Sequence, residues 1–421
     1  MKSIIQKILC LILLVAFLSS ALSQVVASTA SDNWPMFHYD PRHTGSTSTA
    51  PATSNALLWS YETNAPIGAS PSIVDGYVYM ASNDGTVYCF KASDGTEVWR
   101  YTMPFRQAIS SSIAVVDGYA YFGSYDYNVY CLNAATGNKV WSFKTEYTVQ
   151  SSPAVANGRL YVGSWDGNIY CLDALDGYKK WNYTTGGIVD SSPAIAEGYV
   201  YFASADKNIY CLDESTGAKK WSYTTGGVIQ SSPTVVDGYL YIGSQDSNIY
   251  CLNANTGEKV WSYQTQSWVD STPAVDNGYV YIGTGVSDNP DKNIYCLNAS
   301  SGQKVWSYET YDGVYSSPAV ASGYLYVGGW DSNVYCLNAS SGENAWTYTT
   351  NGHISSSPAV SEGVVYIGSW DHQIYAFGSQ TTTTTDLAQL IVPIVAVIAV
   401  IVVIIAMILI IKSRKNRKNH P

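Results

Sequence analysis

Two carboxylates and two amides occupy equivalent places in this sequence, and they are well suited to do chemistry. Asp190, Asp270, Gln150 and Gln230 each stand three residues before a proline that recurs along the chain, as does Tyr315. Acids, amides and aromatic rings around a concavity suit a sugar, a peptide or a cofactor. The same residue types occur in any ring of polar loops, so ligand binding and a purely structural role both remain open.

Three more candidates, Arg106, Trp268 and His353, lie in the variable stretches that lead to the same prolines. We join them to the five residues above as one candidate ligand-binding set, and assign no residue to catalysis or to a metal. Asp190 and Asp270 are two repeats apart, which predicts a separation of about 10–15 Å at strand spacings of about 5 Å. That distance is wide for one proton relay and suits the grip of an extended ligand.

Two other groups of polar residues raise the question of a metal. His38, Asp40 and His43 lie close together near the N-terminus, but no pair of them has ligand spacing on a regular element. We expect this stretch to be a strap that packs Trp34 and Phe37 onto the domain.

The second group lies in the stretch TGVSDNPDKN at 284–293, where one repeat carries five extra residues. Asp288, Asn289, Asp291 and Asn293 resemble the oxygen-rich spacing of calcium loops. The Glu that would complete such a site is absent, so a longer turn is the favoured interpretation.

These residues must be positioned by a repeat that builds almost the whole chain. Its clearest copy is SSPAVANGRLYVGSWDGNIYCLDALDGYKKWNY at 151–183, and it recurs at a step of 40 residues, with one step of 45. Eight starts are visible. A fixed period of this length indicates a repeat architecture.

Each copy divides into four short runs that predict β-strands, separated by Asp-Gly, Asp-x-Asn and Thr-Gly turns. Neither face of the second run is polar, so both faces must be covered. Eight four-stranded antiparallel sheets with two buried faces predict an all-β, eight-bladed propeller. The first strand of a propeller blade lies innermost, so the residues before the recurring proline should crowd the mouth of the axial channel.

The fourth run carries a motif of known type, in the form LNAATGNKVW at 132–141 and LNANTGEKVW at 252–261. It resembles the tryptophan-docking motif of the pyrroloquinoline-quinone-like (PQQ-like) propellers, a family that includes quinoprotein alcohol dehydrogenases and the BamB-type assembly lipoprotein. The lead-in DNWPMFHYDPRHTG at 32–45 is similar to the segment before many such propellers. The resemblance covers about residues 34–379 and implies the same eight-bladed fold.

The resemblance implies two functions. Family dehydrogenases use PQQ with a calcium ion, an Asp base and commonly an adjacent Cys-Cys pair, whereas this sequence has no Cys-Cys pair and no long insertion for a lid. We therefore expect a binding or scaffold module that recognises a protein, a glycan or a small ligand at the axial face. A PQQ-dependent quinoprotein oxidoreductase is the alternative, with Asp190 and Asp270 as its only axial acids.

The two ends of the repeat region complement each other. LLWSY at 57–61 matches only the fourth run, and 357–379 supplies only the first three runs. A closed ring leaves no free sheet edge, so the N-terminal run should complete the eighth blade. Eight tryptophans then occupy equivalent structural places: Trp59, Trp99, Trp141, Trp181, Trp221, Trp261, Trp306 and Trp346.

Seven of the eight cysteines follow a tyrosine in the third run, where the eighth blade has Ala376. Exchange with alanine indicates a small buried side chain. Equivalent third strands of adjacent blades should lie about 10 Å apart, beyond disulfide distance. We expect these thiols to be reduced and buried.

The termini predict a membrane-anchored protein. Residues 1–27 are typical of a secretory signal peptide. The strap follows at 28–55, the propeller at 56–379 and a Thr-rich stalk at 380–386. Residues 387–411 are 25 uncharged residues, enough for one transmembrane helix. The basic tail at 412–421 places the C-terminus in the cytoplasm and the propeller outside the cell.

Charge excludes one class of partner. Residues 24–385 hold 15 Lys and Arg against 31 Asp and Glu, a net charge of −16, which gives no electrostatic footprint for nucleic acid. An Asp recurs at the turn between the second and third runs of seven blades. We expect these aspartates to bond their own turns first.

Overall fold

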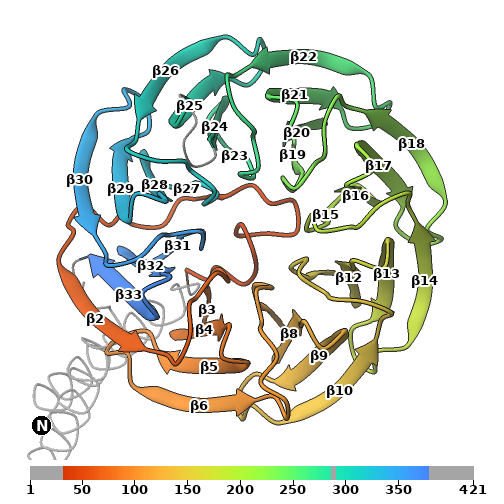
Figure 1. The fold of residues 1–421 in the computed structure, drawn as a ribbon, viewed down its shortest axis with the longest axis vertical. Coiled ribbons are helices and arrows are strands. Elements are labelled where there is room, and N and C mark those ends of the chain that lie inside the picture. The colour runs from red at the N-terminus through yellow and green to blue at the C-terminus, as the bar shows by residue number, and fades with distance from the viewer. Residues whose placement is uncertain (1–31, 286–290, 379–421) are drawn as a thin grey trace, which may run out of the picture. The chain divides into compact units, whose positions relative to one another are not determined.

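The computed structural model describes residues 32–285 and 291–378, and in this part of the chain it contains eight β-sheets of antiparallel blades around one axis (Figure 1). The eight-bladed propeller predicted from the repeat is confirmed. No helix in the described ranges is long and apolar enough to cross a membrane. The predicted signal peptide, stalk, transmembrane segment and tail lie outside them, as do Asp288 and Asn289.

Each blade runs from a three-residue inner strand to a six-residue outer strand, in the order first, second, third, fourth. The inner strands are β3 (Ser72–Val74), β7 (Ala114–Val116), β11 (Ala154–Ala156), β15 (Ala194–Ala196), β19 (Thr234–Val236), β23 (Ala274–Asp276), β27 (Ala319–Ala321) and β31 (Ala359–Ser361). The second strands are β4 (Tyr77–Ser82), β8 (Tyr119–Gly123), β12 (Arg159–Gly163), β16 (Tyr199–Ala203), β20 (Tyr239–Ser244), β24 (Tyr279–Gly283), β28 (Tyr324–Gly328) and β32 (Val364–Gly368).

The third strands are β5 (Thr86–Lys91), β9 (Asn128–Asn133), β13 (Asn168–Asp173), β17 (Asn208–Asp213), β21 (Asn248–Asn253), β25 (Asn293–Asn298), β29 (Asn333–Asn338) and β33 (Gln373–Gly378). The outer strands are β6 (Glu97–Thr102), β10 (Lys139–Lys144), β14 (Lys179–Thr184), β18 (Lys219–Thr224), β22 (Lys259–Gln264), β26 (Lys304–Glu309), β30 (Asn344–Thr349) and β2 (Leu57–Glu62). The second and third strands are buried on both faces, because each sheet packs between two neighbours.

Tryptophans of the outer strands fasten each blade to the next. The Trp221 indole N–H donates to the Ala254 carbonyl of the following blade at 2.9 Å, and equivalent bonds recur at every blade interface. Gly257 lies against this indole with φ +75°, and a Cβ there would lie 2.7 Å from the ring. The glycine of the Thr-Gly turn is therefore required both by its backbone conformation and by the docked tryptophan.

Serines join the inner strands into a second ring. The Ser152 backbone N–H donates to the Ser192 hydroxyl at 3.0 Å, and Ser192 donates in turn to Ser232 at 2.9 Å. The series continues through all eight blades, with Thr272 in place of a serine in the sixth, and closes where Ser357 donates to Ser70 at 2.9 Å. We call this set the serine ring; it explains why Ser-Ser-Pro begins the repeat.

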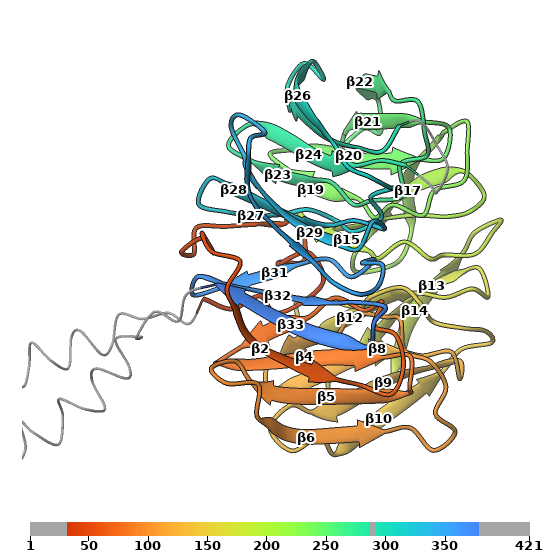
Figure 2. The same ribbon diagram turned by 60° about the vertical axis from the view of Figure 1, so that its left-hand side comes forward.

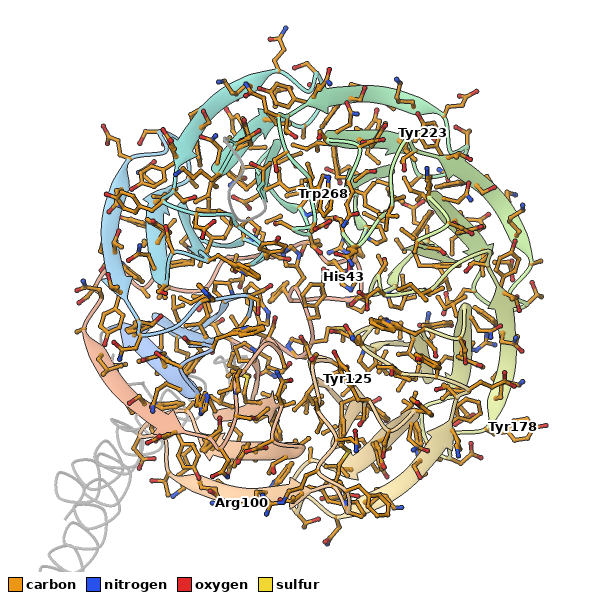
Figure 3. All side chains as sticks on the ribbon, in the orientation of Figure 1. His43, Arg100, Tyr125, Tyr178, Tyr223 and Trp268 are labelled. Atoms are coloured by element: carbon orange, nitrogen blue, oxygen red, sulfur yellow. The ribbon has the colours of Figure 1, made fainter. Side chains whose placement is uncertain are left out.

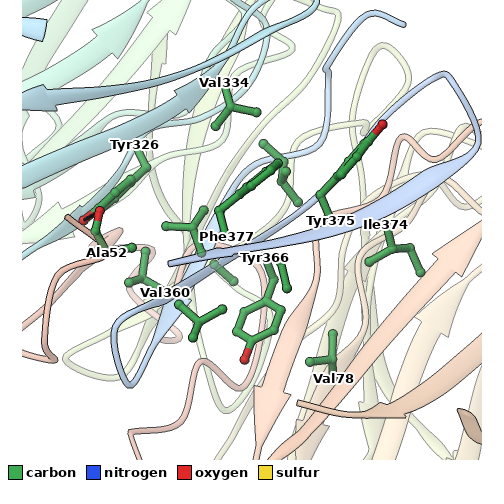
Figure 4. Packing of buried hydrophobic residues seen from close by; sticks show 14 of the residues in the cluster. Ala52, Val78, Tyr326, Val334, Val360, Tyr366, Ile374, Tyr375 and Phe377 are labelled. Atoms are coloured by element: carbon green, nitrogen blue, oxygen red, sulfur yellow. Dashed lines mark hydrogen bonds between the residues drawn. The ribbon is translucent and has the colours of Figure 1, made fainter. Parts of the chain in front are cut away.

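Residues from both ends of the chain complete the eighth blade, as the complementary fragments predicted. β2 pairs antiparallel with β33, placing Trp59 opposite Ala376 and Tyr61 opposite Ile374, and Figure 1 shows the two strands side by side. The apolar cluster beneath this seam joins residues of the last two blades and the first, including Val78, Tyr326 and Phe377 (Figure 4).

All seven described cysteines are free and buried, as predicted. Burial raises the pKa of the Cys171 thiol to about 11, so the thiolate is scarce at neutral pH. Ala376 fills the equivalent place in the eighth blade and is equally buried.

The segment from Asp32 to Thr49 forms the predicted strap along the inner strands (Figure 2). Its backbone exchanges hydrogen bonds with six of them, β3, β7, β15, β19, β23 and β27. Ser46–Thr47, which is β1, pairs in parallel with β27. Trp34 is buried in the core, whereas Phe37 is half-buried and packs edge-on against His43. The strap therefore ties together blades that are distant in sequence.

Candidate functional site

The connections between blades and the turns between second and third strands lie at the same end of every blade. We call this end the connection face. The Trp165 backbone N–H donates to the Thr148 carbonyl at 2.9 Å, and Gln245 donates to Val228 at 2.9 Å. The same bond recurs in each blade, so each turn is held against the connection that precedes its own inner strand.

The recurring turn aspartates hold this geometry. Asp166 accepts hydrogen bonds from the backbone of Asn168 at 2.9 Å, from the Tyr170 hydroxyl at 2.7 Å and from the backbone of Glu146 at 3.0 Å. The expectation that these residues serve their own turns is confirmed. In the sixth blade Asp291 has this role, since it bonds the Tyr295 hydroxyl and accepts from the Gln266 backbone at 2.7 Å.

Two sets of side chains alternate around the axis on the connection face, and we call them together the axial ring. One set stands three residues before the recurring proline, or before Ile113 in the second blade. The other directly precedes the turn aspartate in seven blades, and in the sixth blade its equivalent is Gly285, six residues before Asp291. In chain order the ring is Gly68, Asn83, Ser110, Tyr125, Gln150, Trp165, Asp190, Ala205, Gln230, Gln245, Asp270, Gly285, Tyr315, Trp330, Ser355 and Trp370.

Neighbouring members of the axial ring bond one another across blade boundaries. The Trp165 indole N–H donates to Asp190 at 3.1 Å, and the Gln150 amide donates to the Tyr125 hydroxyl. The Gln245 amide donates to Asp270 at 3.1 Å and to Gln230 at 3.3 Å. The structure therefore places the four predicted residues in three bonded groups, Gln150 with Tyr125, Asp190 with Trp165, and Gln230 with Asp270 through Gln245, which we call together the polar band.

Aromatic rings dominate the opposite part of the axial ring. Trp330 lies 4.6 Å from Tyr315 and 5.2 Å from His353 between ring centroids, and 6.4 Å from Trp370. The Trp370 indole N–H donates to Ser355 at 2.9 Å. The predicted residues Tyr315 and His353 thus meet through Trp330, on which His353 stacks.

Burial sets the electrostatics of the two axial acids. It raises the pKa of Asp190, and it raises the pKa of Asp270 to about 6, with a further upward contribution from the charge of Asp190. Hydrogen bonds from Trp165 and Gln245 oppose these shifts. The negative charge of Asp190 thus acts on Asp270, and the axial ring contains no lysine or arginine to neutralise the two carboxylates.

Arg106 and Trp268 lie on the connections, outside the polar band. Trp268 is 46% exposed and lies near the axis together with Tyr125 (Figure 3). Arg106 is exposed, and its side chain makes no hydrogen bond or ion pair with the described residues. Of the eight predicted residues, these two are the least tied to the others.

The members of the axial ring that were not among the predicted site residues include Tyr125, Trp165, Gln245, Trp330 and Trp370. Their signal is present in the sequence. Each stands between a Ser or Gly and an Asp that hardly change between blades, yet the position itself varies in type from Asn to Trp. Variation inside a constant turn marks a side chain whose partners also vary between blades, as Trp165 with Asp190 and Gln245 with Asp270 do.

The strap histidines are held by backbone carbonyls. His38 Nε2 lies 2.9 Å from the Pro318 oxygen, and His43 Nδ1 lies 3.0 Å from the Pro233 oxygen. Burial lowers the pKa of both, that of His43 to about 3. Asp40 bonds the backbone and side chain of Arg42. These contacts support the strap interpretation, and in the described ranges no three acidic, His or Cys side chains group as a metal site.

A separate cavity of about 610 Å³ lies between the first two blades, at the end opposite the connection face. Tyr77, Tyr79, Trp99 and Asp117 line part of it, and Asn33 of the strap borders it. It shares no residue with the axial ring.

Comparison with known proteins identifies the fold family. The family model described as outer membrane protein assembly factor BamB matches residues 45–149, 125–228, 205–314 and 290–385. No curated protein matches the chain significantly.

Solved structures share the same fold. BamB from Moraxella catarrhalis is 22% identical, with a TM-score of 0.66 over 77% of this chain and 98% of that protein. A europium-containing methanol dehydrogenase is 14% identical, with a TM-score of 0.72 over 83% and 98% of the two chains. The quinohemoprotein alcohol dehydrogenase of Comamonas testosteroni is also 14% identical, with a TM-score of 0.71 over 85% and 83%. With four successive matches spanning its blades, the chain belongs to the PQQ-like repeat β-propeller family related to BamB and the quinoprotein alcohol dehydrogenases.

Proposed function

We propose that this chain is a membrane-anchored binding or scaffold module that presents its propeller outside the cell and takes its ligand at the axial ring. The sequence of 1–27 and 387–411 supports export and a single membrane span. A surface protein or a glycan is the expected partner, and the acidic composition argues against nucleic acid.

One observation carries the binding role: the blades repeat their packing residues almost unchanged but differ at the axial ring. A tryptophan of the outer strand donates to a backbone carbonyl in all eight blades, whereas the ring position before the proline varies from Gly68 to Asp190 to Tyr315. Side chains that differ between blades, are half-buried or exposed and bond one another provide a surface for recognition.

The quinone cofactor of family dehydrogenases fits this ring poorly. PQQ is a planar quinone with three carboxylates, and it would meet Asp190 and Asp270 in a ring without lysine or arginine. Anionic groups of like sign oppose one another when desolvated. The indole of Trp165 and the amide of Gln245, which could face such a ligand, are engaged with the two aspartates. Redox catalysis is therefore not the function we propose.

The proposal is tested by screening the full-length protein, in detergent, against glycans, peptides and cofactors. The double change Asp190→Ala and Asp270→Ala should weaken any ligand that the screen identifies by at least about tenfold. The matched control is Asp176→Ala with Glu258→Ala, which removes two exposed carboxylates from turns at the opposite end. Equal loss of binding in both double variants would remove the axial ring from the proposal.

Anchoring is tested separately by ending the chain at residue 386. The shortened protein should appear in the medium, whereas the full chain should stay with membranes after alkaline carbonate washing. Release of the full chain by carbonate would contradict the predicted span.

A further inference from the structure

We propose that the axial ring binds a neutral oligosaccharide chain, which lies across the connection face between two groups of aromatic rings. This inference rests on the proposed binding function and names its ligand class. It is carried by the arrangement of the aromatic rings, with the polar band between them.

The first aromatic group is a stack of three nearly parallel rings. Tyr127 and Tyr147 lie 5.2 Å apart at 13° between planes, and Tyr147 and Trp165 lie 6.4 Å apart at 10°. Tyr147 is 48% exposed. Soluble proteins seldom leave grouped aromatic rings uncovered unless they bind something there.

The second aromatic group contains Trp330 with Tyr315, His353 and Trp370. Trp370 is 43% exposed, and its N–H is already bonded to Ser355. With the polar edge of the indole occupied, the apolar face is what remains for a ligand. The flat C–H face of a pyranose packs well on such an aromatic face.

The two groups come from different parts of the ring, the second and third blades and the sixth to eighth. The chain between them supplies Asp190, Gln230, Gln245 and Asp270, and Gln150 lies within the first group; these residues bond one another or their aromatic neighbours. Carboxylates accept hydrogen bonds and amides both donate and accept, so together they match the hydroxyl groups of a sugar. Because the groups already bond one another, little side-chain entropy is lost when a ligand binds.

Charge narrows the ligand class further. No lysine or arginine belongs to the ring, so phosphates, sulfated glycans and uronic acid chains find no cation within it, although the exposed Arg106 lies on the connection face outside the ring. Only two of the ring members are acidic, which is few for a polycationic peptide. The raised pKa of Asp270, about 6, also leaves that carboxyl partly protonated in mildly acidic solution.

The test titrates the full-length protein with cellohexaose, mannohexaose and chitohexaose while tryptophan fluorescence is recorded. The detergent must lack a sugar head group, because such a head group would compete. Hexagalacturonate and hexalysine are the anionic and cationic comparisons. At least one neutral hexasaccharide should bind, with an affinity that changes less than about twofold between low and high salt, unlike that of a charged ligand.

Variants assign the binding to the ring. Tyr147→Ala and Trp370→Ala should each lower the affinity for the neutral hexasaccharide about tenfold. Tyr178→Ala is the matched control, because Tyr178 is 70% exposed at the opposite end of the blades, and it should leave the affinity unchanged.

Each other outcome overturns the sugar assignment in a recognisable way. Binding of hexalysine alone, lost in Asp190→Ala, would keep the axial ring as a binding site and replace its ligand class. Binding of hexasaccharides that is unaffected by both ring variants would move the site elsewhere and remove the proposed function with it. Failure of all three neutral chains to bind at millimolar concentration would exclude this class of ligand.

Discussion

The outer edge of each blade and its connection face follow opposite rules. At the outer edge all eight blades carry a tryptophan that donates to a backbone carbonyl of the next blade, or of the strap for Trp346. At the connection face, members of the axial ring range from glycine to aspartate to tryptophan. Yet the serine ring, only two residues from the ring positions that precede the proline, is as regular as the outer edge.

This contrast shows which contacts keep the same residue types in every blade. A residue that contacts the next blade meets nearly the same surroundings in every copy, so a change at this position weakens the packing between two blades. A residue of the axial ring faces the axis as well as its neighbours, and its partners are other variable side chains. Sequence variation among the blades therefore distinguishes the contacts that hold the propeller together from the side chains that are available to a ligand.

The largest effect should come from removing the N-terminal segment, which supplies both an outer strand and the strap along the inner strands. Deleting residues 28–62 takes away β2, the Ala52 carbonyl that accepts from Trp346 and all strap bonds to six inner strands. The melting temperature should fall by more than about 10 °C. Deleting only 28–31 leaves every described strap contact and is the control. An unchanged melting curve for the long deletion would show that ring closure needs neither element.

The contrast between the edges predicts unequal costs for two tryptophans. Trp221→Ala should lower the free energy of unfolding by about 3–5 kcal/mol, because it leaves a cavity between blades. Trp370→Ala, at the axial ring and 43% exposed, should cost less than about 1 kcal/mol. Chemical denaturation of both variants measures the difference. Similar costs would mean that the axial ring is as much a part of the packing as the outer edge.

A smaller effect should appear as a pH dependence at the axial ring. The folded-state pKa of Asp270, about 6, lies above its ordinary unfolded value, so the folded state binds more protons between these values. Stability should therefore fall as pH rises from about 4 to about 6, and stay lower above. Asp270→Asn should raise the melting temperature at pH 8 by about 2–4 °C, and at pH 4 the difference should vanish. A variant that is less stable than the native chain at pH 8 would contradict the burial argument.

The smallest effect should be at the third strand, where packing is uniform but one blade already carries a substitute. Cys171→Ala should cost about 1 kcal/mol or less, since Ala376 fills the same place. Thiol titration should find the seven described cysteines slow to react before denaturation and all reactive afterwards. Disulfides between blades in a peptide map would refute the free-thiol assignment.

The repeated parts of the fold were predicted well from the sequence, because the residues that form them recur from blade to blade. The propeller, the completion of the last blade by β2, the buried cysteines and the structural turn aspartates were all predicted from residues that recur in register. The strap was predicted from Trp34 and its neighbours as a packing element, but its bonds to six inner strands were not. Those bonds are formed by backbone groups, so no pattern of side chains in the sequence indicates them.

The candidate site was predicted only in part. Positions before the recurring proline were found because they vary where everything around them repeats. Their partners Trp165 and Trp330 were missed, although they vary just as clearly, because they lie in a turn whose aspartate has an obvious structural role. The spacing of 25 residues between Trp165 and Asp190 crosses a blade boundary, so the repeat alone gives no reason to pair them.

The bond between the Trp346 indole and the Ala52 carbonyl joins residues 294 positions apart, and it has a consequence for biosynthesis. Residues 32–62 leave the ribosome first, but their partners in β30 and β33 are made last. The first residues of the propeller therefore have no partner for these contacts until nearly the whole chain has been made. The last open sheet edge of the propeller is therefore paired only when synthesis is almost finished. Until then, this edge is available for association with other chains.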